Sequence, residues 1–120
     1  MRLHWNMPLA VRSHYLAELE ASKHARSTGE LQHEWHHLQR AHILAQRWPL
    51  EHNAVHWRML NYGLRIKDTR EIIGQLPRLV FGGVKSFVGT VPIGNTGGAD
   101  VPALRAMPLP ADLALILRST

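Results

Sequence analysis

Histidine is the residue type in this chain best suited to chemistry: it occurs nine times in 120 residues, and there is no cysteine. Neutral imidazole binds Zn²⁺, Fe²⁺, Ni²⁺ and Cu²⁺, and it also acts as a general acid or base near neutral pH. Four of the histidines lie in one stretch, HEWHHLQRAH, residues 33–42. Two groups of histidines in and after this stretch have spacings that suit a metal site.

The first group spells H-E-x-x-H with His33, Glu34 and His37, the pattern in which zinc proteases supply two ligands and a general base. At about 100° per residue, His33 and His37 point roughly 140° away from the apolar stripe that contains His42. Arg40, one turn further on, would oppose a dication through its own charge. We therefore expect a solvated, histidine-rich helix face here and not a protease site.

The second group comprises His42, His52 and His56. The apolar periodicity places all three on helix faces that are predicted to point into the core. His42 belongs to the apolar stripe of one helix, while His52 and His56 lie one turn apart on the inward face of the next. A short link makes these two helices antiparallel neighbours. At a rise of 1.5 Å per residue, His42 lies ~8 Å from the turn and the other two ~3 and ~9 Å from it. The three imidazoles should therefore meet between the helices.

These three histidines predict a transition-metal site in which the metal is Zn, Fe, Ni or Cu. Three protein ligands with an open fourth position are also the pattern of catalytic zinc, although no catalytic residue can be named. Gln39, one turn before His42, is a candidate weak ligand or hydrogen-bonding support, and Met59, one turn after His56, is a soft donor suited to copper. The alternative is that the histidines are hydrogen-bonded core residues.

Hydrophobic periodicity predicts the helices that position these side chains. The first runs from about Pro8 to Arg26, the second from about Glu30 to Arg47, and the third from about Leu50 to Lys67. A fourth begins at residues 68–71, an Asp-x-x-Glu variant of the capping box, with a kink or break at Pro77. The expected fold class is all-α, a small bundle of about four helices built from antiparallel hairpins.

The apolar positions of these helices form the expected core. They are Val11, Tyr15, Leu16 and Leu19 in the first helix; Leu31, Trp35, Leu38, His42 and Ala45 in the second; Val55, Met59, Gly63 and Ile66, beside His52 and His56, in the third; and Ile72, Leu76, Leu79 and Val80 in the fourth.

The composition changes at residue 82, after which glycine and proline become frequent. We expect one helical domain over residues 1–120, in which an ordered Gly/Pro-rich segment, residues 82–109, wraps over a helical bundle of residues 1–81. A short last helix should follow over residues 110–118.

Within this segment, residues 94–98 read GNTGG. They are not a Walker A loop, because the GK[ST] ending and the preceding strand are missing. Asn and Gly tolerate positive φ, so the stretch suits a turn. Its functional interpretation is that it folds back over the bundle and closes a pocket, with Asn95 and Thr96 as polar contacts and residues 107–110, MPLP, holding the tail by apolar contact.

Composition narrows the possible partners and location. The absence of cysteine excludes disulfides, thiolate zinc sites and iron–sulfur clusters. The net charge of +5 favours an anionic partner, but Lys and Arg are scattered singly, which disfavours nucleic-acid binding. The N-terminus lacks the apolar region of a secretion signal, and no stretch approaches the roughly 20 apolar residues of a membrane helix. We expect a cytoplasmic protein without membrane contact.

Several stretches resemble a family of small bacterial proteins, domain of unknown function 3703. They are LQRAHILAQRWPLEHNAVHWRML, REIIGQLPRL, VPIGNTGGADV and MPLPADL, and the resemblance runs from about Leu16 to Leu113. It implies a helical fold and marks His42, His52 and His56 as candidate positions, and it gives no weight to H-E-x-x-H. The family pattern has Glu at the position of Gln39, which would give the E-x-x-H of di-iron bundles. Gln39 removes that charge and puts a di-iron centre in doubt here.

The leading functional hypothesis is a small metal-binding helical protein with its site between the second and third helices; whether it is an enzyme stays open. One alternative is a metal-free interaction module that docks a protein partner or a second copy through faces that include Trp57 and Tyr62. Another is a metal-independent enzyme that uses one buried histidine as acid or base, with the GNTG stretch as substrate cradle.

Overall fold

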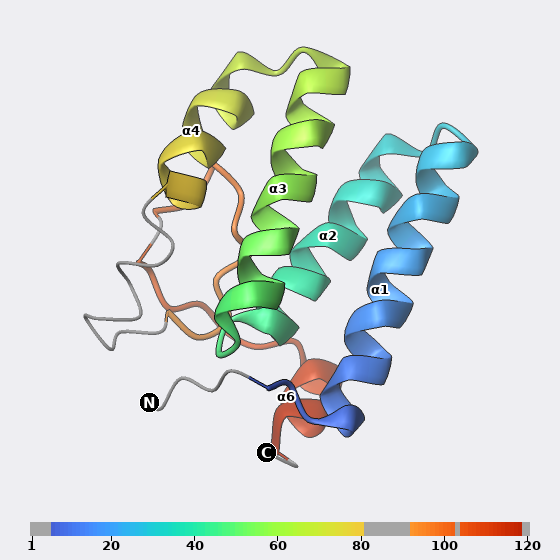
Figure 1. The fold of residues 1–120 in the computed structure, drawn as a ribbon, viewed down its shortest axis with the longest axis vertical. Helices are drawn as coiled ribbons and strands as arrows, with labels where there is room; N and C mark the ends of the chain where they lie inside the picture. The colour runs from blue at the N-terminus through green and yellow to red at the C-terminus, as the bar shows by residue number, and fades with distance from the viewer. Residues whose placement is uncertain (1–5, 81–91, 103, 119–120) are drawn as a thin grey trace.

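A computed structural model of the chain describes residues 6–80, 92–102 and 104–118 (Figure 1). In these residues every regular element is a helix, which confirms the all-α fold class. The first ten residues of the predicted Gly/Pro-rich segment, 82–91, lie outside the described residues. The helices are α1 (Leu9–Ser27), α2 (Leu31–Ala45), α3 (Pro49–Ile66), α4 (Thr69–Val80) and α6 (Ala111–Arg118).

Local chemistry sets the boundaries of the helices. Trp48 is extended, with φ −119° and ψ 103°, because a residue that precedes proline avoids the helical region, and Pro49 then opens α3. Asp68 caps α4 by accepting a hydrogen bond of 3.1 Å from the Glu71 N–H, as one half of the predicted capping box requires. The Glu71 side chain does not complete the box, because its two oxygens bind partners elsewhere.

Consecutive helices from α1 to α4 run in opposite directions, and α2 packs between α1 and α3 (Figure 1). The helix α4 packs on α3, and α6 lies under one end of α1 and α2. The predicted inward face of α3 is buried from His52 to Gly63. The core is built mainly from the first three helices, with Leu113 contributed by α6.

Four predicted core positions are wrong: Leu16, Leu31, Leu76 and Val80 are 47%, 45%, 47% and 72% exposed. The buried stripe of α1 is narrow because this helix packs mainly on α2, which leaves Leu16 outside. The inward side of α4 carries the polar residues Glu71 and Gln75 instead of Leu76 and Val80. Polar side chains are needed there because they hydrogen-bond the backbone of the Gly-rich segment.

Two further expectations need correction. Of the kink or break expected at Pro77, the break is wrong, because α4 continues to Val80. The carbonyl that loses its partner belongs to Ile73, which is 63% exposed and can bind water. Tyr62 is buried, with its ring centroid 4.8 Å from that of Trp35, so it offers no exposed face for docking.

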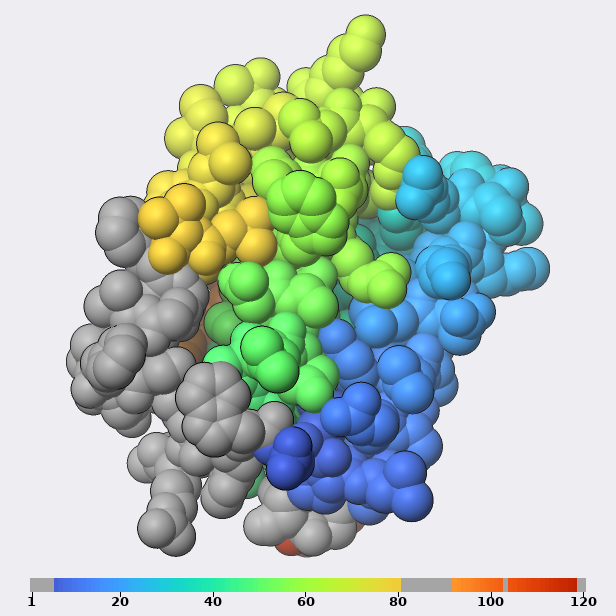
Figure 2. All heavy atoms as spheres, viewed as in Figure 1, coloured from blue at the N-terminus to red at the C-terminus, as the bar shows by residue number. Residues whose placement is uncertain are grey.

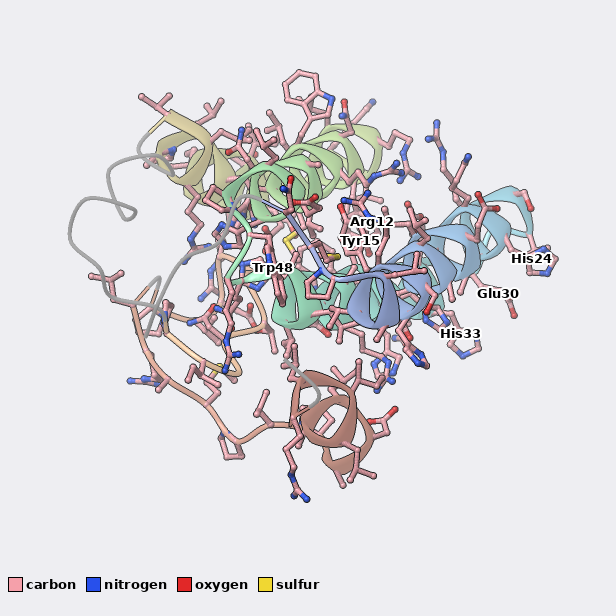
Figure 3. The ribbon with its side chains drawn as sticks, turned by 60° about the horizontal axis from the view of Figure 1, so that its bottom comes forward. Arg12, Tyr15, His24, Glu30, His33 and Trp48 are labelled. Atoms are coloured by element: carbon pink, nitrogen blue, oxygen red, sulfur yellow. The ribbon has the colours of Figure 1, made fainter. Side chains whose placement is uncertain are left out.

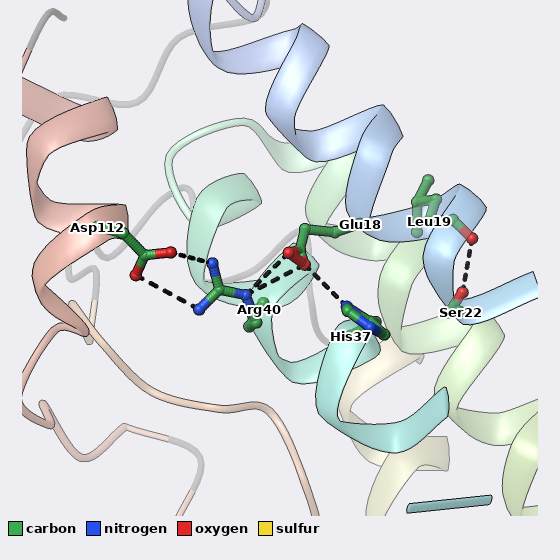
Figure 4. A network of polar contacts seen from close by, with 6 residues as sticks. All are labelled: Glu18, Leu19, Ser22, His37, Arg40 and Asp112. Carbon is green, nitrogen blue, oxygen red and sulfur yellow. Dashed lines mark hydrogen bonds and ion pairs between the residues drawn. The ribbon is translucent and has the colours of Figure 1, made fainter. Parts of the chain in front are cut away.

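The last part of the chain is tied to the bundle at both ends. The Gln46 side chain, at the end of α2, donates to the Pro92 carbonyl at 2.8 Å, and Leu109 packs against the core. In α6, Leu113 is fully buried and Asp112 pairs with Arg40 of α2 (Figure 4). No helix in the described part of the chain has the length and apolarity that a membrane span requires.

Candidate metal centre

The Nε2 atoms of three buried histidines form a triangle between α2 and α3. The distances are 2.8 Å between His42 and His52, 3.0 Å between His42 and His56, and 3.2 Å between His52 and His56. The side chains are at most 8% exposed. Among the described residues they are the one cluster of metal-ligating types close enough to hold a single ion. The structure therefore brings together the three histidines of the second predicted group.

A backbone carbonyl fixes the proton of His42. Its Nδ1 lies 2.7 Å from the Asn95 carbonyl oxygen, which can only accept a hydrogen bond. We therefore assign the proton to Nδ1 of the neutral ring. The Nε2 of His42 then carries a lone pair that points toward the centre of the triangle.

A side-chain amide fixes the proton of His56 in the same way. Its Nδ1 lies 2.6 Å from Gln75 Oε1. The amide orientation follows from its other end, because the Gln75 nitrogen donates to Glu71 Oε2 and to the Gly97 carbonyl, both at 2.8 Å. His56 therefore donates from Nδ1 and also turns a lone pair on Nε2 inward.

The consequence is an electrostatic conflict in the metal-free neutral state. Two lone pairs, on Nε2 of His42 and of His56, face each other across 3.0 Å. A ring nitrogen either donates or accepts, so three neutral rings cannot form a hydrogen bond between every one of the three close nitrogen pairs. A bound cation removes the conflict, since it accepts all three lone pairs at once.

The triangle also has the size that a metal requires. A tetrahedral zinc ion about 2.0–2.1 Å from each nitrogen separates its ligand atoms by about 3.3 Å. The observed edges of 2.8–3.2 Å need to open by only a few tenths of an ångström, roughly what small ring rotations supply. The hydrogen bonds from Nδ1 to Asn95 and Gln75 are the type of second-shell contact that orients metal-binding imidazoles.

The GNTG stretch lies directly against His42. A Cβ added at Gly97 would be 2.5 Å from Cδ2 of the His42 ring, and its φ of +86° also favours glycine. The Asn95 side chain folds back on its own loop, donating to the Pro102 and Arg105 carbonyls and accepting from the Gly97 N–H, each at 2.8 Å. Thus Asn95 contacts the site through its backbone carbonyl, while its amide shapes the loop.

Arg78 of α4 holds the same loop from the other side. Its guanidinium donates to the Gly97 carbonyl at 3.2 Å and to the Val101 carbonyl at 2.7 Å. Desolvation lowers the pKa of Arg78 below its ordinary value, and the nearby Glu71 carboxylate acts in the opposite direction. The loop that carries Asn95 is therefore bound to α4 by three side chains, Glu71, Gln75 and Arg78.

The remaining predicted site residues lie around this centre without a hydrogen bond to the three imidazoles in the described part of the chain. Thr96 and Gln39 are half-buried. Met59 is fully buried, and its sulfur accepts from the Gln75 amide at 3.5 Å. Met59 therefore packs behind His56, against the residue that orients it.

The H-E-x-x-H residues point to three separate places. His33 is exposed and lies 3.5 Å from Glu30 at the end of the bundle (Figure 3). His37 lies 3.2 Å from Glu18 of α1, which also binds Arg40 (Figure 4). Glu34, which we expected on a solvated face, is 4% exposed and pairs with Arg65 of α3. These three side chains form no common site.

Sequence reasoning missed Gln75 and Glu71, which link His56 to the Gly-rich segment. Glu71 accepts from the Ala99 N–H and the Gln75 amide, and Gln75 accepts from His56. The one signal available was their spacing of one helical turn. Polar residues at that spacing on an amphipathic helix are ordinarily assigned to its solvent face, so the signal was weak.

Comparison with known proteins identifies one family. Its model, described as a protein of unknown function (DUF3703), matches residues 9–117. The chain belongs to the DUF3703 family. The matched range contains the three histidines and both residues that orient them. No curated protein and no solved structure matches the chain.

Proposed function

We propose that this DUF3703 protein binds one transition-metal ion through Nε2 of His42, His52 and His56. The observation that carries the proposal is the triangle of Nε2 atoms 2.8–3.2 Å apart, with the Nδ1 atoms of His42 and His56 held outward by Asn95 and Gln75. A core that used these histidines only for packing would keep their Nε2 atoms apart or pair them with other groups, because three ring nitrogens cannot all hydrogen-bond one another.

The donor set selects the kind of metal. Three imidazole nitrogens suit Zn²⁺, Cu²⁺, Ni²⁺ and Fe²⁺, whereas Mg²⁺ and Ca²⁺ prefer oxygen ligands. In the described residues, no carboxylate belongs to the cluster. This composition disfavours the carboxylate-bridged di-iron centre that E-x-x-H would imply, in keeping with Gln39 at the position of the glutamate.

The metal would join segments that are distant in the sequence. His42 comes from α2 and the other two ligands from α3, while Gln75 and Asn95 attach α4 and the Gly-rich segment to the ligand rings. A three-nitrogen site also leaves a coordination position for water, and the bound metal would supply Lewis-acid chemistry there. The proposal is of metal binding and assigns no reaction.

The test is equilibrium dialysis of untagged, chelator-treated protein against Zn²⁺ and Co²⁺, followed by elemental analysis. We expect one equivalent in the wild type and less than a tenth of that in a His42→Ala/His56→Ala variant at the same free metal concentration.

The matched control is His33→Ala/His37→Ala, which removes two histidines from the same chain but leaves the triangle intact. It should retain one equivalent. Equal loss in both double variants, or no stoichiometric binding in the wild type, would contradict the proposal.

A further inference from the structure

A groove of about 600 Å³ lies between α1 and α3, and none of the three clustered histidines lines it. The two helices are joined at one end, where Tyr15 and Arg12 bind Glu51 at 3.2 and 3.1 Å. Toward the other end they diverge, and Figure 2 shows the hollow between the green surface of α3 and the blue surface of α1. Its volume falls within the range of small-molecule sites.

The groove is strongly basic. Lys23 and Arg26 of α1 and Arg58 and Arg65 of α3 line it, against one acidic residue, Glu34 of α2. Arg65 pairs with Glu34, and Lys23 lies 3.6 Å from Glu20. Neither Arg26 nor Arg58 makes an ion pair within the described ranges. Two guanidinium groups that form no ion pair with any described residue thus line one concave surface.

The floor of the groove has a different character. Glu34 is 4% exposed, and its Oε1 has no hydrogen-bond partner among the described residues. This carboxylate disfavours an anionic group at the floor and instead calls for a hydrogen-bond donor. On the wall, Trp57 is 57% exposed and offers an indole surface.

We propose that this groove binds a small phosphomonoester whose body carries hydroxyl or amino groups. A phosphate of charge about −1.5 to −2 matches the two unpaired guanidinium groups of Arg26 and Arg58, which bind phosphate oxygens in bidentate fashion. A donor on the body then satisfies Glu34 at the floor. The same chemistry occurs in nucleotides and in sugar phosphates, and Trp57 separates the two, because an aromatic base stacks on the indole more strongly than a sugar ring does.

The test is calorimetric titration at fixed ionic strength with AMP, ribose 5-phosphate and inorganic phosphate as probes. We expect saturable one-to-one binding of at least one of the two organic phosphates, tighter than that of inorganic phosphate. Arg58→Gln and Arg26→Gln should each weaken it about tenfold or more, roughly the loss expected for one charge-assisted contact.

The control is Arg70→Gln, which makes the same charge change at an exposed position of α4 outside the groove. Binding should be unchanged in this variant. Trp57→Leu should weaken the binding of AMP more than that of ribose 5-phosphate if the ligand is a nucleotide, and should not discriminate between the two probes if it is a sugar phosphate. The proposal is overturned if no probe binds saturably, if inorganic phosphate binds as tightly as the organic probes, or if the Arg70 and Arg58 variants lose binding equally.

Discussion

Two hydrogen bonds at the residue scale, from His42 to the Asn95 carbonyl and from His56 to the Gln75 amide, determine which nitrogens face the centre of the site. Each places the ring proton on Nδ1 and turns the Nε2 lone pair toward the centre of the triangle. The inward direction of the histidines was predictable, because His42, His52 and His56 occupy positions of regular apolar stripes. The orienting residues were not, because Asn95 acts through its backbone and Gln75 through contacts distant in the sequence.

Gln75→Leu should weaken zinc binding about 10- to 100-fold, the usual cost of losing a residue that orients a metal ligand. The substitution removes the acceptor for the Nδ1 proton of His56. Affinity is measured by competition with a chromophoric chelator. Gln32→Leu, at an exposed position of α2, is the matched control and should bind zinc normally. Unchanged affinity in the Gln75 variant would show that this hydrogen bond does not support the site.

Tyr15 makes the stability of the folded protein depend on pH in the alkaline range. Desolvation by burial raises the pKa of Tyr15 from 10.0 to about 12. Because the unfolded chain ionises this phenol near pH 10 and the native state near 12, stability falls as pH rises across that window, by about 2–3 kcal/mol in total.

The measurement is a titration of tyrosinate absorbance in the wild type and in Tyr15→Phe. The difference between the two curves should have its midpoint near pH 12. A midpoint near pH 10 would mean that the phenol is solvated and that Tyr15 of α1 does not lie against Glu51 of α3 as described.

At the scale of elements, the α2–α3 hairpin was predictable from periodicity and from Trp48-Pro49, whereas the orientation of α4 was not. The apolar pattern favoured Leu76 and Val80 as inward residues, yet Glu71 and Gln75 face inward. The reason is the neighbour of α4: a Gly-rich segment buries few side chains but presents N–H and C=O groups that require polar partners. Sequence periodicity carries no information about such a neighbour.

Gly97→Ala should disrupt the contact between this segment and His42. The added Cβ would lie 2.5 Å from the ring, in addition to the strain of a positive φ. Gly29→Ala is the matched control, because its φ is +75° and no atom lies within 4 Å of the added Cβ. We expect Gly29→Ala to lower the free energy of unfolding by about 1–2 kcal/mol, from backbone strain alone.

We expect Gly97→Ala to lower the free energy of unfolding by about 3 kcal/mol or more, because strain and steric overlap combine. It should also weaken zinc binding. Denaturant unfolding measures the free energy of unfolding, and chelator competition measures the zinc affinity. Equal losses of stability in the two variants, with zinc affinity intact, would mean that the segment does not lie on His42.

At the scale of the whole molecule, the proposed metal joins α2 and α3 directly and α4 and the Gly-rich segment through Gln75 and Asn95. The basic groove between α1 and α3 has its own lining residues, so the two sites are separable by mutation. Binding to the native state alone should stabilise the fold by mass action.

Zinc at about 1,000 times its Kd should therefore add about 4 kcal/mol to the free energy of unfolding. Thermal melts followed by circular dichroism, with and without zinc, measure the change. A chelator should reverse it, and the His42→Ala/His56→Ala variant should show none. A similar zinc effect in that variant would place the stabilising ion elsewhere on the chain.

X-ray absorption spectroscopy of the protein loaded with one equivalent of zinc is the most direct measurement of the central claim. We predict three imidazole nitrogens in the first shell at about 2.0–2.1 Å, with the multiple-scattering pattern of histidine rings. A first shell of oxygen ligands with one imidazole or none would contradict it.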